Sequence, residues 1–175
     1  MTGVPGSDGD RSRLQTRDEV LPGARFGHVS IVAADWRGLA EFYTRLFGCE
    51  IVPPERDYAG SDLERGTGVK GATLRGVHLR LPGHGADGPT LEIYQYGWSE
   101  QRPASVANRL GLAHVAFAVD DVRAARDAVL AAGGRRVGDD VTLQTADGRR
   151  VTWCYVTDPE GNIVELQAWA PAAEP

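Results

Sequence analysis

Two histidines and two glutamates recur in this chain at a regular spacing. His28 and His114 stand 114 − 28 = 86 residues apart in similar surroundings, GHVSIVAAD and AHVAFAVDD. Each is followed by a short apolar segment with a glutamate at its centre, Glu92 in LEI and Glu165 in VEL. Imidazole nitrogens and carboxylate oxygens bind divalent metals, and two buried carboxylates without a cation would be costly. The pattern therefore predicts a divalent metal ion bound by all four side chains.

The same spacing extends beyond these four residues and indicates a duplicated module. At the offset of 86, Asp35 corresponds to Asp121 and Gly48 corresponds to Gly134. The histidine and the glutamate are 92 − 28 = 64 residues apart in the first copy and 165 − 114 = 51 in the second, a difference of 13. We place the additional residues in the polar, glycine-containing segment 54–71, which we expect to be a mobile lid or binding loop.

Both copies carry the periodicities of a β-α-β-β-β module. The first copy predicts a helix that is capped by Asp35 and ends at Gly48, with strands at 26–33, 49–53, 72–81 and 90–96. The second copy predicts a helix at 121–132, with strands at 112–119, 141–145, 149–157 and 163–169. We therefore divide the chain into a disordered or loosely docked N-terminal arm (1–24), a first module (25–96), a linker (97–111), a second module (112–169) and a C-terminal tail (170–175).

The bulk composition restricts the class of protein. With 175 residues, 42% of them hydrophobic, the chain can form two small modules that share a core. Its net charge of −5, with acidic and basic residues interspersed, argues against nucleic acid as a partner. There is neither an apolar signal segment nor a run of roughly 18 apolar residues, so we expect a cytoplasmic protein without a membrane partner. Cys49 and Cys154 are predicted to be free, buried thiols.

Side chains alternate between two faces along a strand, which groups the candidate ligands with their neighbours. His28 shares its face with Ser30, and Glu92 shares its face with Tyr94. The bulkier aliphatic residues fall on the opposite faces and should pack under the helices, which leaves the ligand faces free to form a cavity. From these faces we expect a substrate pocket lined by Ser30, His78, Tyr94, Tyr96 and Gln167.

These residues and motifs resemble the vicinal oxygen chelate superfamily, which includes glyoxalase I, methylmalonyl-CoA epimerase, extradiol dioxygenases and bleomycin-resistance proteins. The resemblance covers residues 25–169 and rests on the four ligand positions, the FYTRLFG helix end, the GLAHVAF strand and the DPEGN turn. It implies an α+β fold in which two βαβββ modules form a U-shaped, incompletely closed eight-stranded sheet around one metal. The ligand set that it implies is that of glyoxalase I: His28, Glu92, His114 and Glu165.

The resemblance also implies a reaction. A divalent ion, whether Ni, Zn, Mn, Co or Fe, would chelate two neighbouring substrate oxygens and make the carbon next to a carbonyl more acidic. We therefore expect a glyoxalase-like lyase or isomerase that acts on a small substrate with vicinal oxygens, and a homodimer as the assembled form. By the same resemblance the catalytic base is a glutamate, with Glu165 the first choice and Glu92 the second.

Three departures from the family pattern restrict the substrate. Val32 stands where glyoxalase I has an arginine for the glutathione carboxylate, and Tyr96 stands where it often has an asparagine. Both differences argue against glutathione. Segment 74–78 lacks the acidic residue that the epimerases carry on this strand, which disfavours racemisation by two bases.

An extradiol dioxygenase is the second interpretation. Its iron would be bound by His28, His114 and Glu165, and Tyr155 stands where these enzymes often have a tyrosine, which adds Tyr155 to the predicted pocket. Glu92 would occupy a coordination position that the substrate and oxygen need. The lyase or isomerase therefore ranks first.

A metal-free, drug-sequestering protein of the bleomycin-resistance type is the third interpretation. Trp98, Trp153 and Trp169 could line its aromatic groove. Such proteins generally lack the complete ligand set. The four intact residues therefore favour an enzyme over a binding protein.

Overall fold

The computed structural model describes residues 21–172 of the chain, so most of the predicted arm at 1–24 and the end of the predicted tail at 170–175 lie outside it. The first half contains β1 (His28–Val32), α1 (Trp36–Phe47), β2 (Glu50–Ala59), α2 (Ser61–Thr67), β3 (Thr73–Arg80) and β4 (Thr90–Tyr96). The second half contains β5 (Val115–Ala118), α3 (Val122–Ala131), β6 (Arg135–Arg136), β7 (Val141–Gln144), β8 (Arg150–Thr157) and β9 (Ile163–Ala170). None of the helices within 21–172 is long and apolar enough to cross a membrane.

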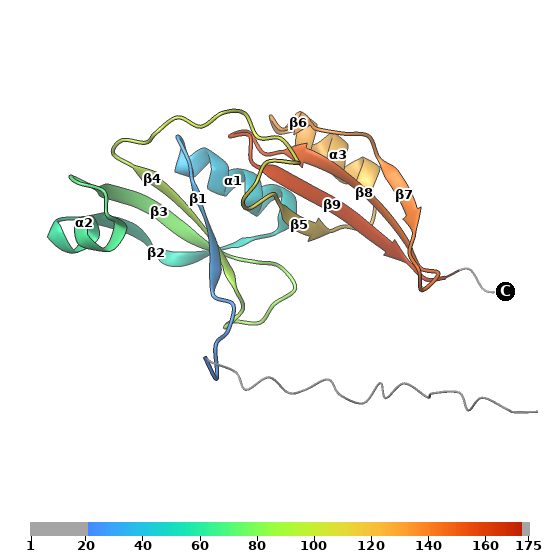
Figure 1. Ribbon diagram of the computed structural model, residues 1–175, viewed down its shortest axis with the longest axis horizontal. Coiled ribbons are helices and arrows are strands. Elements are labelled where there is room, and N and C mark those ends of the chain that lie inside the picture. The colour runs from blue at the N-terminus through green and yellow to red at the C-terminus, as the bar shows by residue number, and fades with distance from the viewer. Residues whose placement is uncertain (1–20, 173–175) are drawn as a thin grey trace, which may run out of the picture.

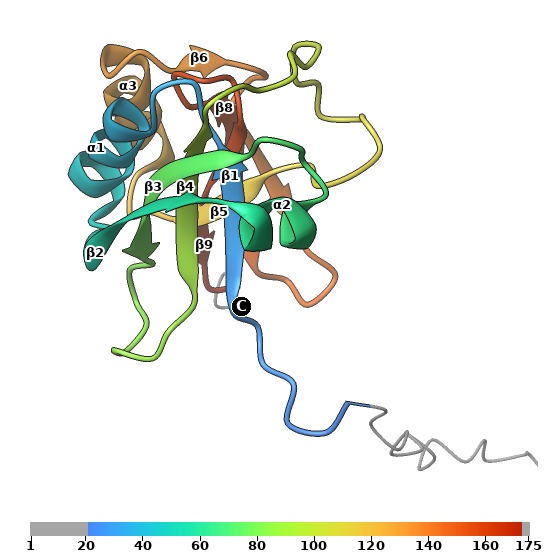
Figure 2. The same cartoon turned by 90° about the vertical axis from the view of Figure 1, so that its left-hand side faces the viewer.

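The strands form two open sheets with the same internal order. The first sheet has the order β1-β4-β3-β2, and the second has the order β5-β9-β8-β6, with β7 also paired to β8. In each sheet the first strand of the module runs parallel to the last. Figures 1 and 2 show the sheets side by side, with α1 and α3 together on one side of the molecule. The predicted α+β fold of two repeated modules is confirmed.

The second strand of each module is where the predicted count of eight strands fails. β2 is one strand with a register shift between Val52 and Arg56, whereas β6 and β7 are separate strands that both pair with β8. Moving β2 along the chain by the repeat offset of 86 gives residues 136–145, which span β6 and β7. In the described part of the chain, nine strands in two sheets therefore replace the predicted single sheet of eight.

The segment 54–71 is not the loop that the sequence predicts. β2 continues through Pro53 and Pro54 to Ala59, and α2 forms much of the remainder. The two prolines lie within the register shift, where the ladder to β3 is interrupted, so their missing N–H groups leave no ladder bond unmade. The predicted strand end at residue 53 treated proline as a strand breaker and is wrong for this reason.

Most of the additional length of the first module is divided between two connections. Residues 60–72 join β2 to β3 and 145–149 join β7 to β8, which is 13 residues against 5. Residues 81–89 join β3 to β4 and 158–162 join β8 to β9, which is 9 against 5. The extra residues are therefore not confined to the predicted segment.

The two longer helices begin as predicted. The side chains of Asp35 and Asp121 accept hydrogen bonds from backbone N–H groups in the first turns of α1 and α3. Side-chain caps of this kind contribute about 1 kcal/mol each to stability. Gly48 ends α1 in the left-handed conformation, with φ of 67°, which a residue with a side chain rarely adopts. These caps fix where the chain leaves β1 and β5.

A single hydrophobic core lies under both helices and joins the modules. The ring of Phe47, at the end of α1, stacks on Phe117 of β5 with ring centroids 4.1 Å apart. The hydroxyl of Tyr43 donates a hydrogen bond of 3.0 Å to the buried Asp158 after β8. The carboxylate of Glu160 accepts hydrogen bonds from two backbone N–H groups just before α1. The modules are thus held together on the helical side.

The two cysteines are free and buried, as predicted. Burial raises the pKa of both Cys49 and Cys154 to about 11. Because a thiolate is the reactive form of cysteine, neither residue is a nucleophile at neutral pH.

Candidate metal and substrate site

The first sheet brings His28 and Glu92 together on the face turned away from the helices. Ser30 of β1 lies opposite Glu92 of β4, and His28 precedes Ser30 by two residues on the same face. His28 Nδ1 lies 3.4 Å from Glu92 Oε1. The histidine side chain is 53% exposed and the glutamate side chain 11%. An open imidazole therefore stands beside a largely buried carboxylate.

His78 adds a second imidazole to this carboxylate. It lies on β3 directly opposite Glu92, and its Nε2 atom is 3.1 Å from Glu92 Oε1 and 2.7 Å from the hydroxyl of Tyr94. Burial lowers the pKa of His78, and it raises the pKa of Tyr94 to about 12. At neutral pH the pair is therefore a neutral imidazole beside a phenol, and both groups restrict how Glu92 can turn.

The second sheet brings His114 and Glu165 together in the same way. His114 precedes β5, and its Nε2 atom lies 2.8 Å from Oε2 of Glu165 on β9. Tyr155 of β8 stands directly opposite Glu165, and its ring lies 5.1 Å from the His114 ring. Burial, and then the charge of Glu165, raise the pKa of Tyr155. The tyrosine therefore stays protonated beside the carboxylate.

The two pairs occupy equivalent places in their sheets. In each case the glutamate sits two residues into the last strand, and a residue of the preceding strand faces it across the ladder. That facing residue is His78 in the first sheet and Tyr155 in the second. The repeat in the sequence is thus also a repeat of geometry. The two sites differ in the residue that faces the glutamate, a histidine in the first sheet and a tyrosine in the second.

The structure groups the four predicted ligands as two pairs. Within residues 21–172, no three or more His, Cys, Asp or Glu side chains gather in an arrangement that could hold a metal ion. The nitrogen-to-oxygen distances within the pairs, 3.4 and 2.8 Å, are close to the separation of about 3 Å between adjacent ligands of an octahedral ion with 2.1 Å bonds. The donor chemistry of each pair therefore suits one divalent ion, and the joint four-ligand site stays a prediction.

A cavity of about 330 Å³ lies between the edge strands of the two sheets. Its walls include Ser30 and Val32 of β1, His114 before β5, and Arg102 and Arg109 of the linker. Apolar linker residues complete the lining. This cavity connects the outer strand of the first sheet with one of the predicted ligands, and Ser30 borders it.

The other predicted pocket residues lie outside this cavity, on the open faces of the sheets. Tyr94 contacts His78, and Tyr155 contacts His114. Gln167 of β9 accepts a hydrogen bond of 2.8 Å from the indole of Trp169, and Tyr96 ends β4. These residues extend the two His–Glu pairs along their sheets, and the joint substrate pocket stays a prediction.

Three arginines near these elements were not found from the sequence. Arg102 and Arg109 line the cavity from the linker, which has no periodicity to orient them. Arg56 lies on β2, in a segment predicted as a loop. The alternation of Arg56 and Tyr58 with the acidic residues Glu55 and Asp57 was the signal that could have placed Arg56 on a strand.

The chain is similar to known proteins over most of its length. Residues 28–166 match the family model described as a glyoxalase-like domain. A curated relative is the ethylmalonyl-CoA/methylmalonyl-CoA epimerase of Cereibacter sphaeroides, 28% identical over 143 residues, which are 82% of this chain and 96% of the relative.

Solved structures share the fold at lower sequence identity. The glyoxalase family protein of Bacillus cereus is 17% identical, with a TM-score of 0.63 over 88% of this chain and 98% of its own. The glyoxalase family protein of Enterococcus faecalis is 23% identical, with a TM-score of 0.51 over 82% of this chain and 96% of its own. These likenesses support the fold of two repeated modules.

Proposed function

The chain belongs to the glyoxalase-like domain family, and from this premise we propose that it is a divalent-metal-dependent enzyme of the isomerase or lyase type. It would move a proton at the carbon next to a carbonyl of a small substrate with neighbouring oxygens. The observation that carries the proposal is the doubled His–Glu pair, once in each sheet, on the faces turned away from the helices.

His28, Glu92, His114 and Glu165 would hold the metal, with Ni, Zn, Mn, Co and Fe as candidates. When bound, the ion supplies Lewis acidity that makes the neighbouring C–H bond easier to deprotonate. The two imidazoles and two carboxylates balance the charge of a divalent ion. Without a cation, the largely buried carboxylate of Glu92 lies between two imidazole nitrogens, 3.4 and 3.1 Å from its Oε1 atom.

Within the chain, Glu165 is the better placed general base. Its Oε2 atom contacts His114, and the facing residue is a tyrosine. Glu92 is held at one oxygen by two imidazoles and is more deeply buried, with 11% of its side chain exposed against 17% for Glu165. A general base must be able to reach the proton that it accepts and returns. We therefore assign proton transfer to Glu165 and a holding role to Glu92.

The curated relative supports the isomerase form of this reaction. Its name describes epimerisation of an acyl-CoA, a reaction in which a carbon next to a carbonyl loses and regains a proton. We propose that this chain catalyses a reaction of the same class on an acyl thioester or a similar carbonyl compound. β3 presents His78 to the site, so a second proton carrier would be an imidazole and not a carboxylate.

Exchange of substrate hydrogen for solvent deuterium tests the proposal. Metallated protein is incubated in D₂O with methylmalonyl-CoA, with a hemithioacetal and with acetyl-CoA, and label at the carbon is followed by mass spectrometry. We expect the wild type to exchange hydrogen in methylmalonyl-CoA, in the hemithioacetal or in both. The exchange should be lost in His28→Ala and in Glu165→Gln. It should be kept in the control variant His84→Ala, which alters an exposed turn. Exchange that is equal in all variants, or absent with every carbonyl substrate, would contradict the proposal.

An extradiol dioxygenase is a second candidate because Tyr155 stands beside the His114–Glu165 pair. In that case iron is the active metal, and oxygen is consumed with catechols. Oxygen uptake that depends on His114 and on added iron would favour this candidate, whereas proton exchange with Ni, Co or Mn would favour the isomerase or lyase.

A further inference from the structure

Arg56 carries a buried nitrogen with nothing to bond to. Within residues 21–172, its Nη1 atom is the buried side-chain nitrogen or oxygen that lacks a hydrogen-bond partner. The acidic residues of the same strand are already engaged: Glu50 with Arg80, Glu55 with Arg37, and Asp57 with Arg75. An unpaired N–H of a charged group in a buried place requires an explanation.

The ladder places Arg56 on the face that carries Glu92. Arg56 of β2 lies opposite Gly76 of β3, and Gly76 lies opposite Tyr94 of β4. Directly paired residues share a face, so Arg56, Tyr94 and Glu92 point to the same side. A Cβ atom at Gly76 would collide with the carbonyl of Ile93 and the ring of Tyr94. The glycine therefore leaves room for the ring of Tyr94, in the same row of the sheet as Arg56.

The charges confirm this closeness. Burial lowers the pKa of His78, and the positive charge of Arg56 lowers it further, against the opposing effect of Glu92. Burial raises the pKa of Tyr94 to about 12, and Arg56 acts in the opposite direction. The guanidinium of Arg56 is thus close enough to His78 and to Tyr94 for its charge to affect the pKa of each.

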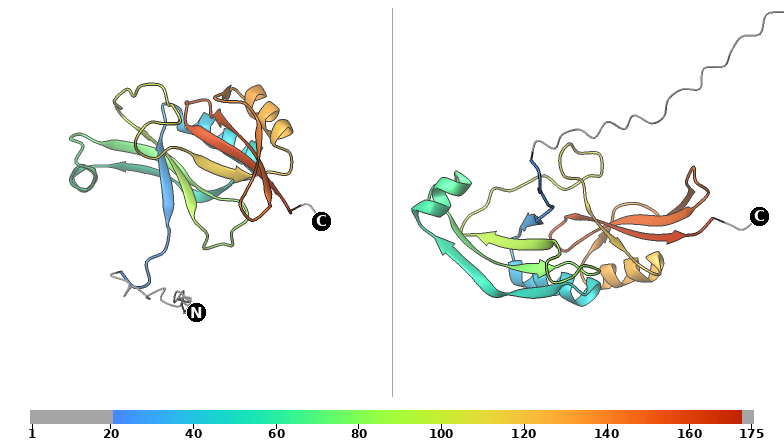
Figure 3. Two further views of the ribbon diagram at one scale, coloured as in Figure 1. Left: turned by 45° about the vertical axis from the view of Figure 1, so that its right-hand side comes forward. Right: turned by 90° about the horizontal axis from the view of Figure 1, so that it is seen from below.

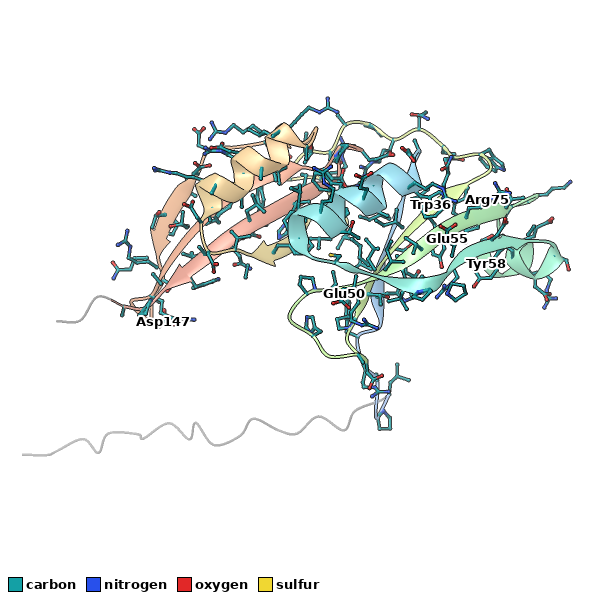
Figure 4. The ribbon with its side chains drawn as sticks, turned by 180° about the vertical axis from the view of Figure 1, so that it is seen from behind. Trp36, Glu50, Glu55, Tyr58, Arg75 and Asp147 are labelled. Carbon is teal, nitrogen blue, oxygen red and sulfur yellow. The ribbon has the colours of Figure 1, made fainter. Side chains whose placement is uncertain are left out.

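Two more phenols complete the surroundings of Arg56. Tyr58 follows it by two residues on β2 and lies in line, across Leu74, with Tyr96 of β4. Figure 4 shows Tyr58 on β2. Both tyrosines influence the pKa of Tyr94, which places them near its hydroxyl. This region of the sheet therefore offers a guanidinium and phenol donors beside the carboxylate of Glu92.

We propose that Arg56 binds a carboxylate of the substrate, which makes the substrate a carbonyl compound that carries a carboxylate near its reacting carbon. This inference rests on the proposed function. A guanidinium meets a carboxylate with two parallel hydrogen bonds, so a bound carboxylate would satisfy the orphaned nitrogen. Arg56, Gly76 and Tyr94 are paired across the three strands, as are His78 and Glu92. The two sets of paired residues are two residues, or about 7 Å, apart along the strand. That distance fits a carboxylate a few bonds away from a carbonyl at the metal.

Binding of malonate and of its neutral diamide, malonamide, tests the inference in protein freed of metal with a chelator. Titration calorimetry should show that the wild type prefers malonate to malonamide. Arg56→Met should weaken malonate binding by about tenfold or more, since hydrogen bonds to charged groups are the stronger class. The malonate affinity of Arg56→Lys should lie between those of the wild type and Arg56→Met, because lysine keeps the charge and loses the paired donors. Arg75→Met is the matched control, because Arg75 is exposed and already bonded to Asp57.

Equal affinities of the wild type for malonate and malonamide would overturn the inference. So would unchanged malonate binding in Arg56→Met or, if that variant does not fold, in Arg56→Lys. The metal content of the variants is measured separately. If no variant and no wild type binds metal, the proposed function fails while the malonate comparison still decides the role of Arg56.

Discussion

The two halves of the molecule build the same His–Glu pair and then surround it differently. In the first sheet, Glu92 is held by His28 and His78, and His78 is held in turn by Tyr94. In the second sheet, Glu165 has a single imidazole, and a tyrosine faces it. A duplicated module thus yields one carboxylate that is fixed and one that is freer to move. This division suits a site that must both bind an ion and carry a proton.

The two sides of the molecule differ as well. On the helical side, a single core and the Tyr43–Asp158 hydrogen bond join the modules. On the open side, the sheets remain separate, and the linker and the cavity lie between their edge strands. Figure 3 shows α1 and α3 together on one side, with the sheets extending from them. The fold therefore joins the modules on the side of α1 and α3 and leaves the two sheets separate on the opposite side.

Replacement of the freer carboxylate should have the largest effect. Glu165→Gln should lower the rate of proton exchange by on the order of 10²–10⁴, the usual contribution of a general base. Glu92→Gln should act mainly on metal affinity. Exchange rates at saturating metal separate the two, with Glu41→Gln on the outer face of α1 as the control. Equal loss of rate in both glutamine variants at saturating metal would remove the division between the sheets.

Loss of the second imidazole should weaken the fixed carboxylate. His78→Asn should lower metal affinity by about 10- to 100-fold, the range found for groups that orient a metal ligand. Tyr155→Phe, at the equivalent position of the second sheet, should change metal affinity by less than about threefold, because no hydrogen bond joins this hydroxyl to Glu165 in the described residues. Metal titrations followed by tryptophan fluorescence measure both. A larger loss of metal affinity in Tyr155→Phe than in His78→Asn would contradict the assignment of the more firmly held carboxylate to the first sheet.

The hydrogen bond between the modules should make a smaller contribution. Tyr43→Phe leaves the Asp158 carboxylate without one of its buried donors and should lower the free energy of unfolding by about 1–2 kcal/mol. Urea denaturation measures the change. Tyr58→Phe, at an exposed hydroxyl, is the control and should change it by less than about 0.5 kcal/mol. An unchanged free energy of unfolding in Tyr43→Phe would mean that this hydrogen bond does not help to hold the modules together.

The short turn of the second module should show the smallest effect, and only in part of the pH range. Hydrogen bonds from Thr145 and Arg149 lower the pKa of Asp147 to about 2, and Figure 4 shows this residue at the end of the molecule. Because the folded pKa is depressed, its stabilisation is present above the ordinary value of about 4 and is lost as the pH falls toward 2. Asp147→Asn should therefore have a lower melting temperature than the wild type at pH 6. The difference in melting temperature should narrow as the pH falls from 4 to 2. A difference that does not depend on pH would contradict this origin.

The sequence predicts the modules well because their signals are local. Alternation along a strand separates His28 from Ile31, and aspartates before the helices are recognisable caps. The same reasoning fails at Pro53 and Pro54, because a register shift in the ladder absorbs them and no sequence signal reports a partner strand.

The surroundings of the site depend on pairing between strands and are therefore harder to predict. The contact of His78 with Glu92 follows from the register of β3 on β4, which brings residues 14 apart in sequence directly opposite one another. Arg56 shares this face only because β2 continues past the prolines and pairs Arg56 with Gly76, which is in turn opposite Tyr94. Neither relation is visible in the alternation of a single strand.

The central claim is that the two His–Glu pairs bind one ion between them. The number of divalent ions bound per chain, measured with manganese or nickel in the wild type, in His28→Ala and in His114→Ala, tests it most directly. We predict one ion per chain in the wild type and less than about a tenth of an ion in either variant at the same free metal concentration, because each loses one of four ligands. Two ions per chain, or one ion that survives removal of either histidine, would show that the pairs act separately and would contradict the claim.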